Sequence, residues 1–195
     1  MTTEPTSRAQ QKSDTRDRIL AAAATIMKER GIAGASVAEV MGSLGLTVGG
    51  FYAHFASKDD MIDRSLRRSM AERRQRFVDT VSVTRWRERL SRMTSRYLTK
   101  QHRDDAAGGC PLPAVMGDVG RTGTGQAALR DEIAALVATL AGEKSDKDPK
   151  ARQAALAVIA LTSGGLTLAR ALGKTALSDE VLTACQGFAR QTLAK

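Results

Sequence analysis

The side chains that commonly carry catalysis are scarce in this sequence. Its 195 residues include two histidines, His54 and His102, and two cysteines, Cys110 and Cys185. The cysteines form no CxxC pair and the histidines no HExxH motif, so neither a disulfide framework nor a zinc site is predicted. The stretch GRTGTG lacks the flanking strand and the order of a nucleotide-binding loop. The sequence predicts no enzyme activity, no metal and no cofactor, and a small helical enzyme is the least favoured alternative.

One thiol has surroundings that would suit a reactive cysteine. Cys110 lies in the stretch GGCPLP, directly after two glycines and before two prolines, in a break between expected helices. An accessible thiol near a cation loses its proton readily, and Arg103 is the candidate cation. Asp104 and Asp105 would oppose that effect, and a free cysteine is more often an inert, buried hydrophobic residue. Sensing of oxidants or electrophiles through Cys110 is one hypothesis, and a packing role is the other.

The stretch LGLTVGGFYAHFASKDD, residues 44–60, suggests a binding function. It holds three of the seven aromatic residues of the chain, and directly before them stand Gly49 and Gly50, each of which weakens a helix by roughly 1 kcal/mol. A short helix, a glycine-containing turn and a second short helix have the spacing of a helix-turn-helix, whose second helix enters the major groove of DNA. Glycines there would let the backbone approach DNA closely, while Phe51 and Phe55 fasten the helix. The alternative is that the glycines merely lengthen a loop.

Composition and charge indicate a globular protein. Hydrophobic residues make up 42% of the chain, which is enough to fill a core. The pattern shows neither a signal peptide nor a membrane span, so a cytoplasmic location is expected. The net charge is +9, yet residues 1–60 carry seven Lys or Arg against seven Asp or Glu, whereas residues 61–110 carry thirteen against six. The arginine-rich run 64–103 is typical of a solvated helix face, so net charge supports a DNA site only weakly.

The elements that must position these residues are helices. Apolar residues recur every three or four positions nearly throughout, and the four prolines lie at apparent breaks, which predicts an all-α fold. The expected helices, in chain order, are 14–30, a short helix capped by Ser36, another capped by Thr47, a long helix from Ser57 to about Val81, and then 86–97, 114–121, 129–140, 150–172 and 178–193.

The segment SVAEVMGSLGLTVGGFYAHFASKDDM, residues 36–61, resembles the TetR family of bacterial transcriptional regulators. The positions that match the family pattern are Thr47, Gly49, Tyr52, His54, Phe55 and Lys58. The resemblance covers about residues 14–62, and beyond them it rests on the number and length of the helices. Met41, Leu44 and Met61 differ from the usual residues of the family, which affects packing between helices. The resemblance implies a three-helix DNA-binding domain, residues 14–60, followed by a larger ligand-binding and dimerisation domain, residues 61–195.

The resemblance also implies which residues contact DNA. Those that would contact the phosphate backbone are Thr47, Tyr52, Lys58, Arg16 and Ser36. Those that would meet base edges are Val48, Gly49 and Gly50. For His54 a phosphate contact and a packing role are both open. Arg8 and Lys12 would belong to a flexible N-terminal arm, residues 1–13.

The C-terminal domain is expected to enclose an apolar cavity for a small-molecule effector and to pair two subunits through its last two helices. Candidate cavity residues are Met70, Trp86, Met93, Tyr97, Cys110 and Met116, although such a stripe at helical spacing is more often plain core. Candidate interface residues are Leu156, Ile159, Leu168, Val181, Leu182 and Phe188, and periodicity does not separate those that face the partner. The expected function is a homodimeric repressor that a ligand releases from a pseudo-palindromic operator. A DNA-binding protein without a ligand is the rival, which the long region after residue 62 disfavours.

Overall fold

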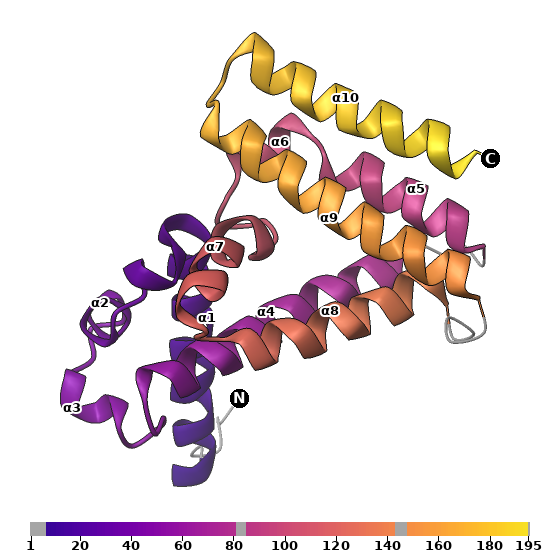
Figure 1. The fold of residues 1–195 in the computed structure, drawn as a ribbon. Helices are drawn as coiled ribbons and strands as arrows, with labels where there is room; N and C mark the ends of the chain where they lie inside the picture. The colour runs from indigo at the N-terminus through magenta and orange to yellow at the C-terminus, as the bar shows by residue number, and fades with distance from the viewer. Residues whose placement is uncertain (1–6, 81–84, 143–147, 195) are drawn as a thin grey trace, which may run out of the picture.

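The computed structural model describes residues 7–80, 85–142 and 148–194, and these residues form ten α-helices and no strand (Figure 1). The predicted all-α fold is confirmed. The predicted end of the fourth helix at Val81 lies outside the described residues. In chain order the helices are α1 (Arg8–Gly34), α2 (Val37–Ser43), α3 (Val48–Phe51), α4 (Lys58–Thr80), α5 (Trp86–Tyr97), α6 (Lys100–Asp104), α7 (Leu112–Thr122), α8 (Gln126–Ala141), α9 (Pro149–Ala171) and α10 (Ala176–Leu193).

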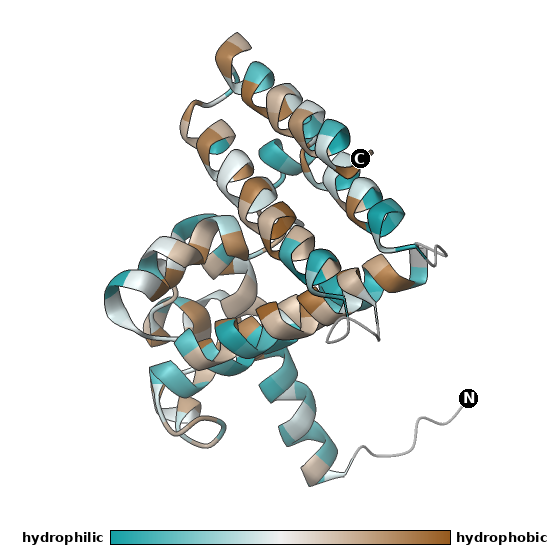
Figure 2. Ribbon diagram, turned by 45° about the vertical axis from the view of Figure 1, so that its right-hand side comes forward, coloured by the Kyte–Doolittle hydropathy of each residue, from teal (hydrophilic) through white to brown (hydrophobic). Residues whose placement is uncertain are grey.

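The first helix begins earlier than predicted. Ser7 caps α1, because its hydroxyl accepts a hydrogen bond from the Gln10 N–H at 3.2 Å. Arg8 and Lys12 therefore belong to the helix and not to an extended arm. Figure 2 shows that these first turns are largely hydrophilic and project away from the rest of the protein. Near the other end, Gly31 has φ 72° and interrupts the regular helix directly after residue 30, the predicted end.

Two short helices follow and form the expected helix-turn-helix. The Ser36 hydroxyl caps α2, and Gly45, with φ 68°, opens the turn toward α3. Thr47 stands at the start of α3, but its side chain makes no capping hydrogen bond, which corrects the predicted cap. Phe51 and Phe55 are 0% and 3% exposed, and their stacked ring centroids lie 5.3 Å apart. These two rings anchor a helix that is too short and too rich in glycine to be stable alone.

The long helix α4 belongs to both halves of the molecule. It begins as predicted after Ser57, whose hydroxyl accepts the Asp60 N–H at 3.1 Å while the Asp60 carboxylate accepts the Ala56 N–H at 3.1 Å. The expected domain boundary at residues 60–61 therefore falls in the first turn of a helix that continues to Thr80. The same helix packs against α1 on one side and α8 on the other (Figure 1).

The helices α5, α9 and α10 lie side by side and form the far end of the molecule from α3 (Figure 1). Gly165 allows α9 and α10 to pack closely, because a methyl group there would lie 2.9 Å from Cys185 Sγ. Among the described residues, α9 is the helix long and apolar enough to cross a membrane, with a mean hydropathy of 1.5 and 44% of that window buried. A core helix has the same properties, so the observation is weak evidence for a membrane span.

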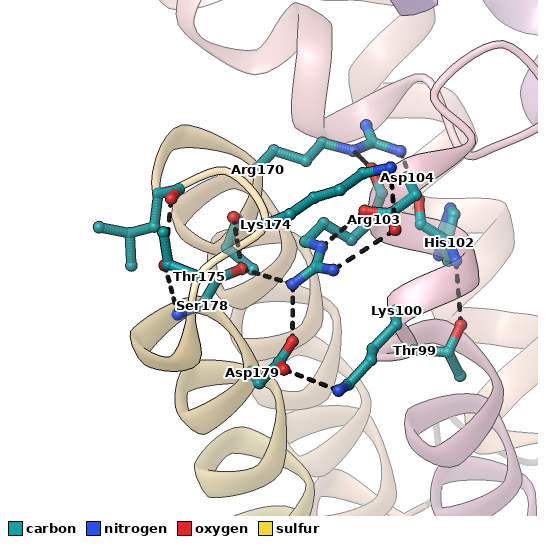
Figure 3. A network of polar contacts seen from close by, with 12 residues as sticks. Thr99, Lys100, His102, Arg103, Asp104, Arg170, Lys174, Thr175, Ser178 and Asp179 are labelled. Atoms are coloured by element: carbon teal, nitrogen blue, oxygen red, sulfur yellow. Dashed lines mark hydrogen bonds and ion pairs between the residues drawn. The ribbon is translucent and has the colours of Figure 1, made fainter.

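A short helix, α6, occupies a stretch that was predicted to be a break, and a buried arginine holds it in place (Figure 3). The Arg103 side chain is 6% exposed and forms ion pairs with Asp104 at 2.7 Å and Asp179 at 2.8 Å. It also donates to the Ser178 hydroxyl at 2.9 Å, which in turn donates to the Ala169 carbonyl at 2.7 Å. This network connects α6 to the junction between α9 and α10.

Candidate functional site

The first turn of α3 is presented to solvent. Val48 is 47% exposed and Tyr52 is 68% exposed, and Thr47, Gly49 and Gly50 are exposed as well. Because Thr47 does not cap the helix with its side chain, its hydroxyl remains available to another partner. Exposed large side chains, a hydroxyl and bare backbone together mark a surface that is suited to binding.

The fold itself does not require glycine at Gly49 or Gly50. Neither residue has a positive φ, so an L-residue would adopt the same backbone without strain. A Cβ atom at Gly49 would meet nothing within 4 Å, and one at Gly50 would make only ordinary contacts with Thr47 and Met41 at 3.6 and 3.9 Å. Alanine would favour the helix at both positions. The folded chain thus gives no reason for glycine at either position.

Basic side chains lie around this surface. Arg16 of α1 stands over the Phe55 ring, 5.9 Å from its centroid, and Lys58 begins α4. Burial, followed by the positive charges of Lys12 and Arg16, lowers the pKa of His54. A neutral His54 lacks the charge that a phosphate contact would use, and its Nδ1 is buried without a hydrogen-bond partner. The packing role is therefore the better interpretation of His54.

The C-terminal helices enclose a cavity of about 360 Å³, which lies between α4, α5, α8 and the segment that leads into α7. Four of the six sequence candidates line it, namely Met70, Met93, Tyr97 and Cys110. Phe77, Leu112 and Leu136 add further apolar surface. Trp86 and Met116 are not among the lining residues: Trp86 stacks with the Arg87 guanidinium at 4.7 Å, and Met116 is 36% exposed.

Sequence reasoning missed the polar side of this cavity. Four arginines and one glutamate border it, namely Arg73, Arg74, Arg76, Arg96 and Glu132. The arginine-rich run was interpreted as a solvated helix face, and that interpretation is wrong for the half-buried Arg73 and Arg74, whereas Arg76 and Arg96 border the cavity and are exposed as well. The signal that could have found two of them is spacing, since Arg73 lies three residues after Met70 and Arg74 lies three residues before Phe77 on the same helix.

A buried histidine organises one end of the cavity. The Nδ1 of His102 donates to the Tyr97 carbonyl at 2.7 Å, and its Nε2 accepts the Cys110 N–H at 3.0 Å. The Arg73 guanidinium lies 3.3 Å from the same Nε2. Burial, together with the positive charge of Arg73, lowers the pKa of His102 to about 4, so the ring is neutral at pH 7.

The surroundings of Cys110 differ from those expected. The thiol is 6% exposed, and Arg103 is engaged with Asp104 and Asp179 in the network of Figure 3. Gly109 serves close packing and not access to the thiol, because a Cβ there would lie 2.9 Å from His102 Nε2. The described residues also contain no cluster of three His, Cys, Asp or Glu that would hold a metal ion.

One carboxylate connects the C-terminal half to the end of α1. The Asp118 Oδ2 of α7 accepts the Ile32 N–H at 2.7 Å, directly after the break at Gly31. A side chain at Gly31 would collide with this carboxylate, since its Cβ would lie 2.5 Å from Asp118 Oδ2. Leu112, which lines the cavity, belongs to the same helix as Asp118. A shift of α7 would therefore be transmitted directly to α1.

The outer surfaces of α9 and α10 carry large apolar side chains. Leu156, Leu168 and Phe188 are 43%, 52% and 64% exposed. Ile159 and Leu182 were also interface candidates, but they are 6% and 4% exposed and pack within their own subunit. Val181 is half-buried against the core. The candidate interface is thus reduced to the three exposed residues, and α10 also carries Leu177, which is 55% exposed.

We expect the neutral state of His102 to make the fold sensitive to mild acid. The unfolded chain takes up a proton at this residue near pH 6.5, whereas the folded protein does so only near pH 4. Stability should therefore be complete above pH 6.5 and fall as the pH drops toward 4, by roughly 1–3 kcal/mol. Urea unfolding at several pH values measures this loss. His102→Gln should flatten the dependence relative to wild type and to the control His54→Gln, and an equal slope in all three proteins would contradict the assignment.

The N-terminal part of the chain matches a known family. A sequence model described as "Bacterial regulatory proteins, tetR family" matches residues 19–64, which run from α1 through the helix-turn-helix into α4. This part of the chain is a TetR-family domain. The residues that carry the match include the exposed first turn of α3 and its two glycines, so the surface described above lies within the TetR-family domain.

Individual relatives agree with the assignment to the TetR family. The HTH-type transcriptional repressor KstR2 of Rhodococcus jostii (strain RHA1) is 37% identical over 67 residues, which cover 34% of this chain. The match spans only about a third of that repressor's length. This relative therefore supports the N-terminal domain and carries no information on the cavity.

Solved structures extend the likeness to the whole fold. The reduced form of NemR from E. coli superposes with a TM-score of 0.74 at 21% identity, covering 91% of this chain and 96% of that one. A TetR transcriptional regulator from Legionella pneumophila has a TM-score of 0.72 at 19% identity, covering 97% and 99%. At such identities the likeness shows a shared fold, which includes the C-terminal helices around the cavity.

Proposed function

We propose that this protein is a homodimeric transcriptional repressor that binds a pseudo-palindromic DNA operator through α3 and leaves it when a small molecule occupies the cavity. In this proposal it works in the cytoplasm, where the DNA is, and catalyses no reaction. The named relative KstR2 is a transcriptional repressor, which supports the regulatory role of the domain that the two proteins share.

The observation that carries the proposal is the pair Gly49 and Gly50. Both are exposed, the fold needs neither, and each weakens the helix that it belongs to. Around them stand the hydroxyls of Thr47 and Tyr52 and the ammonium of Lys58. A recognition helix lying in a major groove explains this combination, because bare backbone can approach the bases while the polar side chains bind the flanking phosphates.

Two substitutions test the phosphate contacts. Tyr52→Ala and Lys58→Ala should each weaken binding to a DNA duplex, selected by the wild-type protein from a random pool, by roughly tenfold, because each removes a hydrogen bond to a charged phosphate. Lys58→Ala should also reduce the slope of log affinity against log salt by about one. Fluorescence anisotropy at several salt concentrations measures both effects.

The control for this experiment is Lys150→Ala, which removes an exposed lysine at the start of α9, far from α3 (Figure 1). It should leave affinity and salt slope unchanged. If Tyr52→Ala and Lys58→Ala both bound DNA as tightly as the wild type, with their folds intact, the assignment of these residues would be overturned.

The response to a ligand follows from how the two halves are connected. A two-fold dimer reads half-sites roughly 34–36 Å apart, so the distance between its two recognition helices decides whether it binds. The cavity borders α7, and Asp118 of α7 holds the end of α1. A ligand that favours a different position of α7 would change that distance, whereas a ligand that binds both states equally would change nothing.

Thiol sensing through Cys110 remains a second hypothesis. Its support is that Cys110 borders the cavity, so a small electrophile inside the cavity would reach the sulfur. Its low exposure from outside and the engagement of Arg103 elsewhere count against it. A Cys110→Ser variant in the ligand experiment below separates covalent from reversible binding.

A further inference from the structure

The cavity combines an apolar wall with an excess of positive charge. Methionine, leucine and aromatic side chains form most of its lining, and four arginines stand against a single glutamate. Arg73 and Arg74 are half-buried, and a cavity that accommodated only neutral hydrocarbon would lose stability by holding these two guanidinium groups at its border, because partly buried charges require partners. The lining therefore points to a ligand that brings a negative charge together with an apolar body.

The one acidic side chain does not neutralise the whole cavity. Glu132, whose side chain is 12% exposed, forms an ion pair with Arg74 at 2.5 Å. Arg73 has neutral neighbours: it lies 3.3 Å from the His102 ring nitrogen and stands over the Tyr97 ring, 5.9 Å from its centroid. Among the described residues Arg73 forms no ion pair, so its charge is left for a partner in the cavity.

A second group in the cavity also lacks a partner. Tyr97 is 5% exposed, and its hydroxyl has no hydrogen-bond partner. Its neighbours are the Cys110 thiol and the Ser163 hydroxyl, neither of which makes a hydrogen bond of normal geometry with it. Burial, followed by Cys110, raises the pKa of Tyr97 well above its ordinary value, so the hydroxyl keeps its proton and can donate. Buried hydroxyls are normally satisfied, which makes this one a candidate ligand contact.

We propose that the cavity binds an organic acid with an apolar body, whose carboxylate pairs with Arg73 and accepts a hydrogen bond from the Tyr97 hydroxyl. The apolar body lies against Met70, Met93 and Leu136. The assignment rests on the proposed function insofar as this acid is the effector, and it names the chemical class of that effector. The cavity volume of about 360 Å³ fits a small acid, since it stands at the lower end of known ligand pockets.

Electrostatics around the cavity favour the same class of ligand. Burial lowers the pKa of Lys28, and the positive charges of Arg76 and Arg73 lower it further. Burial likewise lowers the pKa of Arg170; Tyr97, Cys110 and Asp105 oppose that shift, and Arg73 adds to it. Arg73 thus acts against a neighbouring cation in both cases, and an anion beside it would relieve that repulsion while an amine would increase it.

The test compares matched ligands on the full-length protein without DNA. The probes are decanoate, 4-phenylbutyrate and 2-naphthoate, each paired with its primary amide and with the corresponding primary amine. At least one acid should bind and raise the melting temperature, and it should bind at least roughly tenfold more tightly than its amide, because it gains a charge-assisted hydrogen bond. Isothermal titration calorimetry measures the affinities. The assignment is overturned if none of the acids binds, or if the amides or amines bind as tightly as the acids.

Variants locate the binding groups. Arg73→Met and Tyr97→Phe should each weaken the binding acid by at least roughly tenfold and leave its amide less affected. Tyr97→Phe removes only an oxygen that has no partner, so the melting temperature of the free protein should stay the same or rise, which separates a ligand contact from a structural role. Arg64→Met, on the same helix but outside the cavity lining, is the matched control and should bind the acid normally. Normal acid binding by both cavity variants would overturn the assignment.

Two further results distinguish a failure of this inference from a failure of the proposed function. An acid that binds but does not release the selected DNA supports the cavity assignment and contradicts ligand-responsive repression. Mass spectrometry of the wild-type protein after incubation with the acid should show no covalent adduct. A covalent adduct at Cys110, with binding lost in the serine variant, would overturn reversible binding of an acid in favour of thiol chemistry.

Discussion

Phe188→Glu is expected to convert the dimer into a monomer and to abolish operator binding at concentrations at which the wild type binds. Phe188 is 64% exposed on α10, and α9 carries the exposed apolar side chains Leu156 and Leu168. In a two-fold interface the substitution occurs twice, so a loss of roughly 2–4 kcal/mol per site becomes roughly 4–8 kcal/mol for the dimer. The dimer dissociation constant should rise by about a thousandfold or more. Sedimentation equilibrium over a range of concentrations measures it.

A control on the same helix distinguishes the interface from a general effect of charge. Thr183 is exposed and lies five residues before Phe188, on a different side of α10. Thr183→Glu should leave the dimer intact. A Phe188→Glu protein that stays dimeric, or a wild-type protein that is already monomeric at micromolar concentration, would show that another surface forms the dimer or that none does.

Alanine at Gly49 and Gly50 should change stability and DNA binding in opposite directions. The backbone there has no positive φ and a methyl group meets no close neighbour, so the double variant should be stabilised by up to about 1–2 kcal/mol. For a chain of this length that corresponds to a rise of a few degrees in melting temperature, at about 2–4 °C per kcal/mol. Operator affinity should fall by roughly tenfold to a hundredfold, because each methyl group would occupy space between backbone and DNA.

The matched control for the glycine pair is Gly117→Ala. Gly117 is an exposed glycine inside α7, and a Cβ there also meets nothing within 4 Å. This variant should be stabilised to a similar degree and bind the operator as the wild type does. If Gly49→Ala and Gly50→Ala gained stability without any loss of DNA binding, the glycines would have no role in recognition and the main support for the proposed function would be gone.

The sequence was most informative where structure depends on local signals. Capping by Ser36, the turn at Gly45 and the anchoring rings Phe51 and Phe55 were all predictable, because each acts within a few residues of its position. The all-α fold likewise follows from apolar periodicity over the whole chain. Local signals failed at the start of α1, where Ser7 was not recognised as the cap, and at α3, where Thr47 makes no capping hydrogen bond.

The rest depended on contacts between residues far apart in sequence. Arg103 was paired with Cys110 because they are close in the chain, but its partner Asp179 is 76 residues away. In the sequence, the lining arginines of α4 and α5 cannot be distinguished from any polar helix face. Their place at the cavity depends on α8, whose Glu132 forms an ion pair with Arg74. Ile159 and Leu182 could not be distinguished from the exposed Leu168, because hydrophobicity does not tell a subunit's own core from its partner. Tertiary packing decides all three cases.

The hydrogen bond between Asp118 and the Ile32 N–H bears on how such proteins can be recombined in the laboratory. A chimera made by cutting the chain near residue 60 would join this DNA-reading part to the sensor of another regulator. It would lose the carboxylate for which Gly31 leaves room, and the last turn of α1 would lack its anchor. The interchangeable unit is therefore not a continuous piece of chain. A working hybrid must carry α7, or an acidic residue placed as Asp118 is, along with the first sixty residues.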